Sequence, residues 1–220
     1  MSLHFIREMS RLNKHLIELS DTVEDQVGRS IQAITDLDKD SAQKVIDEDI
    51  EVDRAEIEME EDCLKLLALH QPVANDLRLI ITVLKINNDL ERIGDHAVII
   101  AEEAINLTKL PPIDVPEELY LLSTQAKMML KKSLLAFVEN DLQLARDVLM
   151  LGQGIRQLAE SIFSQQLDSI KASPETAEQR LYILKVARQL QRIADHATNI
   201  SEDIIFLMSG DIIRHSRLTR

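Results

Sequence analysis

The chain has 220 residues, 45% of them apolar, so it can bury the cores of two small domains. It contains only five Gly, five Pro and 3% aromatic residues, which disfavours sheet-rich folds and leaves mainly strong helix formers. The formal net charge of −13 argues against binding to nucleic acid, because proteins that bind a phosphate backbone carry a basic face.

Targeting and membrane signals are weak in this sequence. No uncharged run approaches the roughly 18 residues that a membrane-spanning helix needs, so we expect no direct insertion into a membrane. The N-terminal MSLHFIREMS resembles neither a secretory signal nor an Arg-rich transit peptide. The one cysteine, Cys63, cannot form an internal disulfide, which suits a reducing compartment. We therefore expect a cytoplasmic protein.

Three helices are predicted in the first half of the chain. In the first helix, apolar residues recur every three or four positions, as in a buried helical stripe. This stripe consists of Leu12, Leu16, Leu19, Val23, Val27, Ile31, Ile34 and Leu37. The second helix is expected from about Asp40 to Leu69, and the third follows Pro72. A short Gln71-Pro72 break between them predicts that these two helices are antiparallel neighbours.

The third predicted helix carries an apolar seam that alternates steps of four and three residues, which is a heptad pattern. The seam consists of Ile86, Leu90, Ile93, Ala97, Ile100, Ala104 and Leu107. After it, three prolines between Leu107 and Pro116 predict the end of the helix and a stiff linker.

The second half of the chain repeats the first. A shift of 103 residues aligns 30–46 with 133–149, and a shift of 100 aligns 83–107 with 183–207 with twelve identities in twenty-five. A Ser173-Pro174 break takes the place of Gln71-Pro72. The sequence therefore predicts an all-α fold of six helices, in which two tandem three-helix bundles are related by a pseudo-two-fold.

The predicted boundaries follow from this repeat. The first bundle spans 1–110, a proline-rich linker spans 111–116, and the second bundle spans 117–210. The last ten residues, 211–220, form a basic tail.

The negative charge is concentrated in the first half, which holds 24 acidic and 12 basic residues. Between Asp47 and Asp62, ten carboxylates accompany one base, Arg54. A solvated helix face is the simplest interpretation of such a run.

A second interpretation is a metal site that joins the second and third helices. Glu91 and Asp95 are four residues apart and share one helix face, although like charges at this spacing repel. In an antiparallel hairpin that turns at Pro72, residues whose numbers sum to about 144 face each other. This register places Asp53 opposite Glu91 and Asp49 opposite Asp95. Four carboxylates would then meet in one patch.

Repulsion within such a patch could be relieved by protonation or by a multivalent cation. At about 6 Å and an effective dielectric constant near 20, each carboxylate pair repels by roughly 3 kcal/mol before screening. All-oxygen donors suit a hard divalent or trivalent cation such as iron, manganese, magnesium or calcium, with zinc also compatible. A water-solvated patch without metal stays open as an alternative.

The corresponding positions of the second repeat have lost most of this charge. Gln191 replaces the glutamate, Gly152 and Arg156 stand where the register expects acids, and only Asp195 remains. Arg156 is placed to pair with Asp195 and so to occupy the position of a cation. Whether this second cluster binds metal is therefore in doubt.

The residues that follow the two aspartates point in another direction. His96 and His196 are rotated by about 100° from Asp95 and Asp195, which favours packing or hydrogen bonding over metal ligation. Gly94 corresponds to Ala194, so it favours close helix packing over an unusual backbone angle.

At these residues the chain resembles the PhoU family of phosphate-signalling regulators. The likeness covers essentially the whole chain, and its motifs are LHQPVANDLR (69–78), LERIGDHA (90–97) and LQRIADHATNI (190–200). The resemblance implies a cytoplasmic six-helix protein, commonly dimeric, acting between a phosphate ABC transporter and a sensor histidine kinase to repress the phosphate-starvation response. It also implies surface metal clusters at E/DxxxD motifs, onto which Glu91 and Asp95 map, with Asp49 and Asp53 as the acidic positions of the second helix.

Other classes of protein receive less support. A ferritin-type di-iron oxidase needs Glu-x-x-His pairs that point into the bundle core, and here the acids face away from the seam. There is no P-loop, and Cys63 lies mid-helix without an adjacent base, so we expect no enzymatic activity. A metal-independent helical adaptor is the main alternative to a metal-binding regulator.

Overall fold

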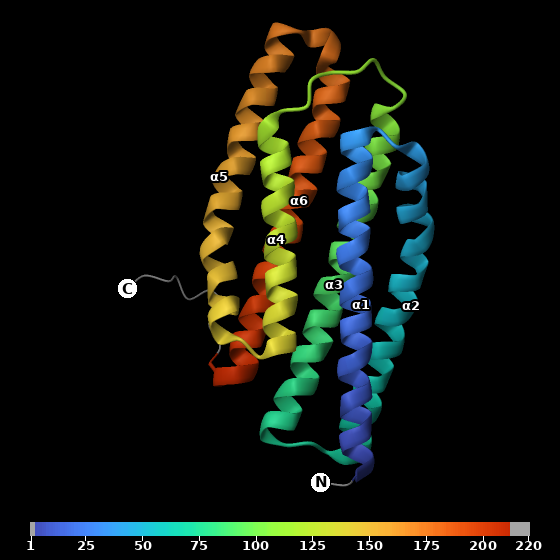
Figure 1. The fold of residues 1–220 in the computed structure, drawn as a ribbon, viewed down its shortest axis with the longest axis vertical. Coiled ribbons are helices and arrows are strands. Elements are labelled where there is room, and N and C mark those ends of the chain that lie inside the picture. Colours follow the sequence, from blue (N-terminus) through green and yellow to red (C-terminus); the bar gives the residue numbers. More distant parts are fainter. Residues whose placement is uncertain (1–2, 212–220) are drawn as a thin grey trace.

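The computed structural model describes residues 3–211 and shows two groups of three helices lying side by side (Figure 1). The six helices are α1 (Leu3–Asp36), α2 (Lys39–His70), α3 (Ala74–Leu107), α4 (Glu117–Glu139), α5 (Leu142–Ala172) and α6 (Ala177–Ser209), with a short 3₁₀ helix η1 (Pro174–Thr176) before α6. No strand occurs among these residues, so the predicted all-α architecture is confirmed. Apart from Asp211, the predicted basic tail at 211–220 lies outside the described residues.

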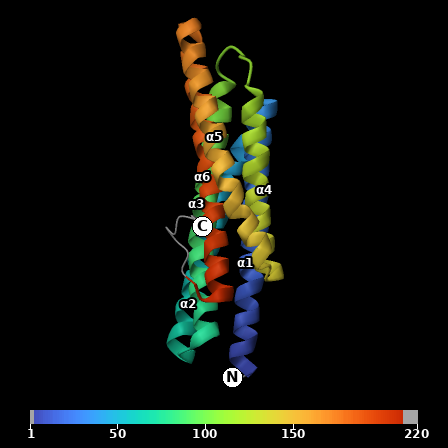
Figure 2. The same ribbon diagram turned by 90° about the vertical axis from the view of Figure 1, so that its left-hand side faces the viewer.

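All six helices run along one long axis, and the view turned by 90° shows the same elongated shape (Figure 2). Helix α3 packs against α6, and α1 packs against α4, so these four helices join the two repeats. Within the described chain, α2 contacts only α1 and α3, and α5 contacts only α4, α6 and η1. Helices α2 and α5 are therefore the outer helices, and each leaves one face uncovered.

Residues that coincide in the repeat have the same structural role in both copies. Asp38 and Asp141 precede α2 and α5, and each carboxylate accepts hydrogen bonds from two backbone N–H groups at the start of its helix. Ser30 and Ser133 are buried, and each donates its hydroxyl to a carbonyl three residues earlier. The internal sequence similarity thus reflects two copies of one local structure.

The predicted apolar seams form the core, with one exception at the end of α1. Every seam residue of α3 from Ile86 to Leu107 is buried. The predicted stripe of α1 was wrong at Leu37, which is exposed and follows the helix with a φ of 50°. This left-handed residue breaks the helical period, so its side chain leaves the face that Ile34 occupies.

The contact between α3 and α6 carries paired charges related by the pseudo-two-fold. Lys85 of α3 lies 3.0 Å from the buried carboxylate of Asp203, and Lys185 of α6 lies 3.1 Å from the buried carboxylate of Glu103. Because the two ion pairs exchange the roles of the repeats, they fix the antiparallel register of α3 against α6.

Candidate functional site

The predicted acidic patch lies between α2 and α3, on the outer side of the first repeat. The predicted hairpin register is confirmed at two points. Asn87 of α3 donates to the backbone carbonyl of Glu56 at 2.9 Å. A Cβ atom added to Gly94 would lie 3.3 Å from Oδ1 of Asp49. Both pairs of residue numbers sum to 143, close to the value of about 144 used for the prediction.

Asp49 is the most perturbed carboxylate of the patch. Burial, followed by the charges of Asp53 and Asp95, raises its pKa from 3.8 to about 6. The side chain of Gln26 on α1 opposes this shift. Gly94 makes room for this arrangement, because a Cβ there would lie 3.3 Å from both Asp49 Oδ1 and Gln26 Oε1. Gly94 therefore permits close packing, as the sequence predicted.

Glu91 and Asp95 extend the patch along α3. Burial and then the charge of Asp95 raise the pKa of Glu91, while Arg92 lowers it. Arg92 lies between the two acids, with Nε 3.3 Å from Glu91 and Nη1 3.4 Å from Asp95. Glu56 is a fifth acid, and burial together with the charges of Glu60 and Asp53 raises its pKa. The structure thus brings the four predicted carboxylates into mutual interaction and adds Glu56 and Arg92.

The patch fits a cation only after a side-chain movement. Oδ1 of Asp49 is buried beside Gly94 and has no hydrogen-bond donor of normal geometry. Across residues 3–211, however, no three donor atoms of the patch lie within 4.8 Å of one another. Arg92 is half-exposed and long, and its departure to solvent would leave Glu91 and Asp95 free to turn toward Asp49. Asp49, Asp53, Glu91 and Asp95 as a metal site therefore remain a prediction.

The family model for the PhoU domain matches this chain twice, over residues 16–104 and 119–204. The chain belongs to the PhoU family. Among curated relatives, it is 34% identical to the phosphate-specific transport system accessory protein PhoU homolog of Pseudomonas aeruginosa, over all of this chain and 91% of that protein. The protein of the same name from Clostridium acetobutylicum is 33% identical over 94% of both chains.

Two solved structures have the same fold. The crystal structure of PhoU from Pseudomonas aeruginosa matches with a TM-score of 0.92 and 33% identity, over 94% of this chain and all of that chain. PhoU from Streptococcus pneumoniae, described as a phosphate transport system regulatory protein, matches with a TM-score of 0.88 and 26% identity, over 94% and 98%. Within residues 3–211, no helix is long and apolar enough to cross a membrane.

The second PhoU repeat differs from the first at the equivalent place between α5 and α6. Arg156 Nη2 lies 3.8 Å from Asp195 Oδ1, which confirms the ion pair that the sequence predicted. Gly152 faces Thr198, whose hydroxyl a Cβ there would approach to 3.5 Å. Toward the other end of α5, an open groove of about 430 Å³ lies between Ala159, Phe163, Leu181 and Arg188. This groove is largely apolar, whereas the equivalent hairpin of the first repeat carries the acidic patch.

The two motif histidines meet at the interface between the repeats. Their ring centroids are 5.4 Å apart, and Nδ1 of His196 lies 2.7 Å from Oδ1 of Asp89. His96 is buried, and burial followed by the charge of His196 lowers its pKa to about 4. The expected packing role is confirmed for both rings, and hydrogen bonding is confirmed for His196.

Sequence reasoning missed several contributions to possible sites, Glu56 among them. Gln26 was missed because hairpin arithmetic for α2 and α3 says nothing about α1. Arg92 was missed because its contacts depend on a side-chain conformation. Another missed feature is a cluster of His4, Glu8 and His70, whose donor atoms all lie within 4.8 Å of one another. The tight turn between α1 and α2 predicts that facing residues sum to about 75, so the same arithmetic would have placed His70 near residue 5.

Proposed function

We propose that this PhoU-family protein represses phosphate uptake and the phosphate-starvation response when phosphate is plentiful. In this proposal it acts in the cytoplasm, at the inner membrane through its partners, and couples a phosphate ABC transporter to a sensor histidine kinase. The observation that carries it is the full-length similarity to phosphate transport accessory proteins, with both repeats matched. A homodimer is part of the proposal.

The proposed role is regulatory and not enzymatic. Burial, followed by the charges of Asp62 and Glu60, raises the pKa of the Cys63 thiol to about 12, which leaves it protonated and unreactive at neutral pH. His96 and His196 contact each other between the repeats, where His96 is buried and His196 is held by Asp89. These groups support a protein that works by binding partners.

Each repeat would supply a different surface for this regulation. A cation held by Asp49, Asp53, Glu91 and Asp95 would neutralise their repulsion and draw α2 toward α3. On the second repeat, the groove with Phe163 and Leu181 exposes apolar side chains beside Lys185 and Arg188. Such a surface suits an amphipathic helix of the transporter ATPase or of the kinase.

Deletion of the gene in its host tests the regulatory proposal directly. Phosphate-starvation genes should become derepressed in phosphate-rich medium, and the unchanged gene on a plasmid should restore repression. A Glu91→Gln plus Asp53→Arg variant should fail to restore it if the metal is regulatory. Full restoration would favour the alternative, a metal-independent helical adaptor. Unchanged expression after deletion would contradict the regulator itself.

A further inference from the structure

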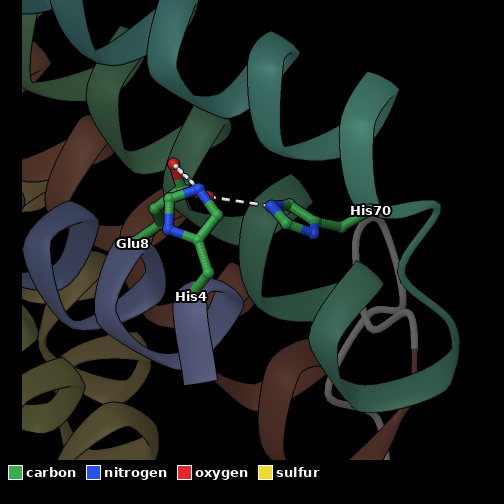
Figure 3. A group of neighbouring side chains, drawn as sticks. All are labelled: His4, Glu8 and His70. Carbon is green, nitrogen blue, oxygen red and sulfur yellow. Dashed lines mark hydrogen bonds and ion pairs between the residues drawn. The ribbon is translucent and has the colours of Figure 1, made fainter. Parts of the chain in front are cut away.

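His4 and Glu8 in the first turns of α1 and His70 at the end of α2 form a compact group of metal-binding side chains (Figure 3). Nε2 of His4 lies 3.3 Å from Oε1 of Glu8, and Nε2 of His70 lies 2.8 Å from Oε2 of the same carboxylate. Both imidazoles therefore present a nitrogen to one glutamate. Two imidazoles and one carboxylate form a frequent ligand set for a transition metal ion that keeps an open position.

The distances suit one tetrahedral ion. Donor atoms bound to zinc at about 2.0–2.1 Å are about 3.3 Å apart at tetrahedral angles. Nε2 of His4 has this separation from Oε1 of Glu8, and Nε2 of His70 lies about half an ångström closer to the other oxygen, Oε2. A small rotation of the Glu8 carboxylate would convert the hydrogen bond to His70 into shared coordination. His4 is well exposed, so its ring can adjust without disturbing the core.

The packing around His70 holds the site in place from the α2 side. The ring of the buried Phe5 lies with its centroid 5.0 Å from that of His70. Directly after His70, Gln71 has a φ of 44°, and its N–H bonds to the Leu67 carbonyl, which ends the helix at this point. His70 thus has a fixed ring on a fixed helix end, whereas His4 and Glu8 come from a regular helical face.

We propose that His4, Glu8 and His70 bind one Zn²⁺ ion, with water at the fourth position, and so tie the start of α1 to the end of α2. Nitrogen donors set this site apart from the all-oxygen patch of Asp49 and Asp95. It also has no counterpart in the second repeat, because α4 begins at Glu117 and is 23 residues long, against 34 residues for α1. The proposal does not depend on the regulatory function proposed above.

The experiment uses the full, untagged chain after treatment with a chelator. Titration calorimetry with Zn²⁺ and visible absorption with Co²⁺ report affinity and coordination, and melting temperature with and without Zn²⁺ reports the tie between helices. We expect one equivalent with the absorption bands of tetrahedral Co²⁺, in addition to any cation at the acidic patch, and a rise in melting temperature. His4→Ala and Glu8→Gln should each weaken this binding at least tenfold. Circular dichroism would verify that both variants keep their helix content.

Two control variants make the outcome specific. His15→Ala removes another histidine of α1 that lies outside the cluster, and it should bind Zn²⁺ as the unchanged protein does. Glu91→Gln plus Asp53→Arg should also keep this equivalent, since it alters only the acidic patch. Equal Zn²⁺ affinity in His4→Ala and the unchanged protein would overturn the proposal and leave only a hydrogen bond between Glu8 and His70. Loss of the equivalent in the patch variant would overturn it as well.

Discussion

The equivalent hairpins of the two repeats, α2–α3 and α5–α6, carry different chemistry. Between α2 and α3, Asp49 is half-buried among carboxylates, and its pKa is raised to about 6. Between α5 and α6, Arg156 pairs with Asp195, and apolar side chains such as Phe163 line the space beyond. The N-caps Asp38 and Asp141 are alike, whereas the helices end differently, and a 3₁₀ helix precedes α6 but not α3. The difference in chemistry comes from the side chains at the equivalent positions of the two hairpins. One architecture therefore offers a candidate cation site on one side and a candidate docking surface on the other.

At the interface of α3 with α6, the two repeats are joined by contacts that are nearly symmetric. The Lys85–Asp203 and Lys185–Glu103 pairs mirror each other. The exception is the histidine pair, where His196 has Asp89 as its partner while the equivalent position near His96 is Gln189. Of these two equivalent positions, only residue 89 carries a carboxylate. Helices α3 and α6 each belong to one of the two hairpins and together form the main contact between the repeats.

The strongest test of the comparison gives the acidic patch of the first repeat the residues found at the equivalent positions of the second repeat. Glu91→Gln plus Asp53→Arg should abolish metal binding at the acidic patch, because it removes two donors and supplies a competing cation. Metal content per chain by elemental analysis and affinity by calorimetry would measure the loss. Iron, manganese and zinc should be tested separately.

A matched control makes the same two types of substitution at other acidic residues, both on α2. Asp47→Arg plus Glu58→Gln gives the same change in net charge, and Glu58 lines a groove against α1 on another side of the helix. This variant should retain binding. Equal loss in both variants would indicate a diffuse electrostatic effect and contradict a defined site.

The reverse conversion is the second prediction. Gly152→Asp, Arg156→Asp and Gln191→Glu place three carboxylates around Asp195, four in all, where only an exposed ion pair now exists. With chelator, the variant should melt at a lower temperature at neutral pH because the new carboxylates repel, and it should recover on acidification. With metal, it should recover at neutral pH and bind an additional equivalent. Melting curves and metal content that match the parent would show that the patch geometry alone does not make a site.

The sequence contained enough information to predict which residues face each other in each hairpin, because helix rise is constant and the loops are short. Knowing the turn at Pro72 was sufficient to bring Asp49 to Asp95, and the repeat then located Arg156 beside Asp195. The environment of each side chain could not be read in the same way. Burial of Asp49 depends on α1 supplying Gln26, and the partners of Glu91 depend on where the Arg92 side chain lies.

The packing of one repeat on the other was also beyond the sequence patterns. Hydrophobic periodicity showed that α3 and α6 each have an apolar seam but did not show that they pack on each other. Leu37 illustrates a local failure, since its apolar character continued the stripe although the helix had already ended at Asp36. Such ends depend on competition between the helix and the following cap, Asp38.

The third prediction uses the asymmetry of the histidine pair. Because the pKa of His96 is about 4 in the folded protein, against about 6.5 when unfolded, the unfolded chain binds more protons between these values. Stability should therefore be complete above pH 6.5 and fall as the pH drops toward 4. In a His96→Leu variant, the free energy of unfolding should fall by about 2 kcal/mol less between pH 6.5 and pH 4 than it does in the unchanged protein. Urea denaturation from pH 4 to 8 measures it, and an unchanged slope would contradict a neutral buried His96.

The smallest expected effect concerns Asp49, and its sign is opposite. A pKa raised from 3.8 to about 6 means that the folded protein binds more protons, so this group favours the folded state at low pH and loses that contribution as the pH rises through 6. Asp49→Asn should therefore stabilise the metal-free protein at pH 7. Solvent screens a half-buried carboxylate, so we expect about 1 kcal/mol rather than the roughly 3 kcal/mol of a dry site. Below pH 6 the contributions of Asp49 and His96 oppose each other, so the double variant is needed to separate them. If Asp49→Asn leaves stability at pH 7 unchanged or lowers it, then neighbouring carboxylates do not repel Asp49. The acidic patch would then gain no stability from a bound cation.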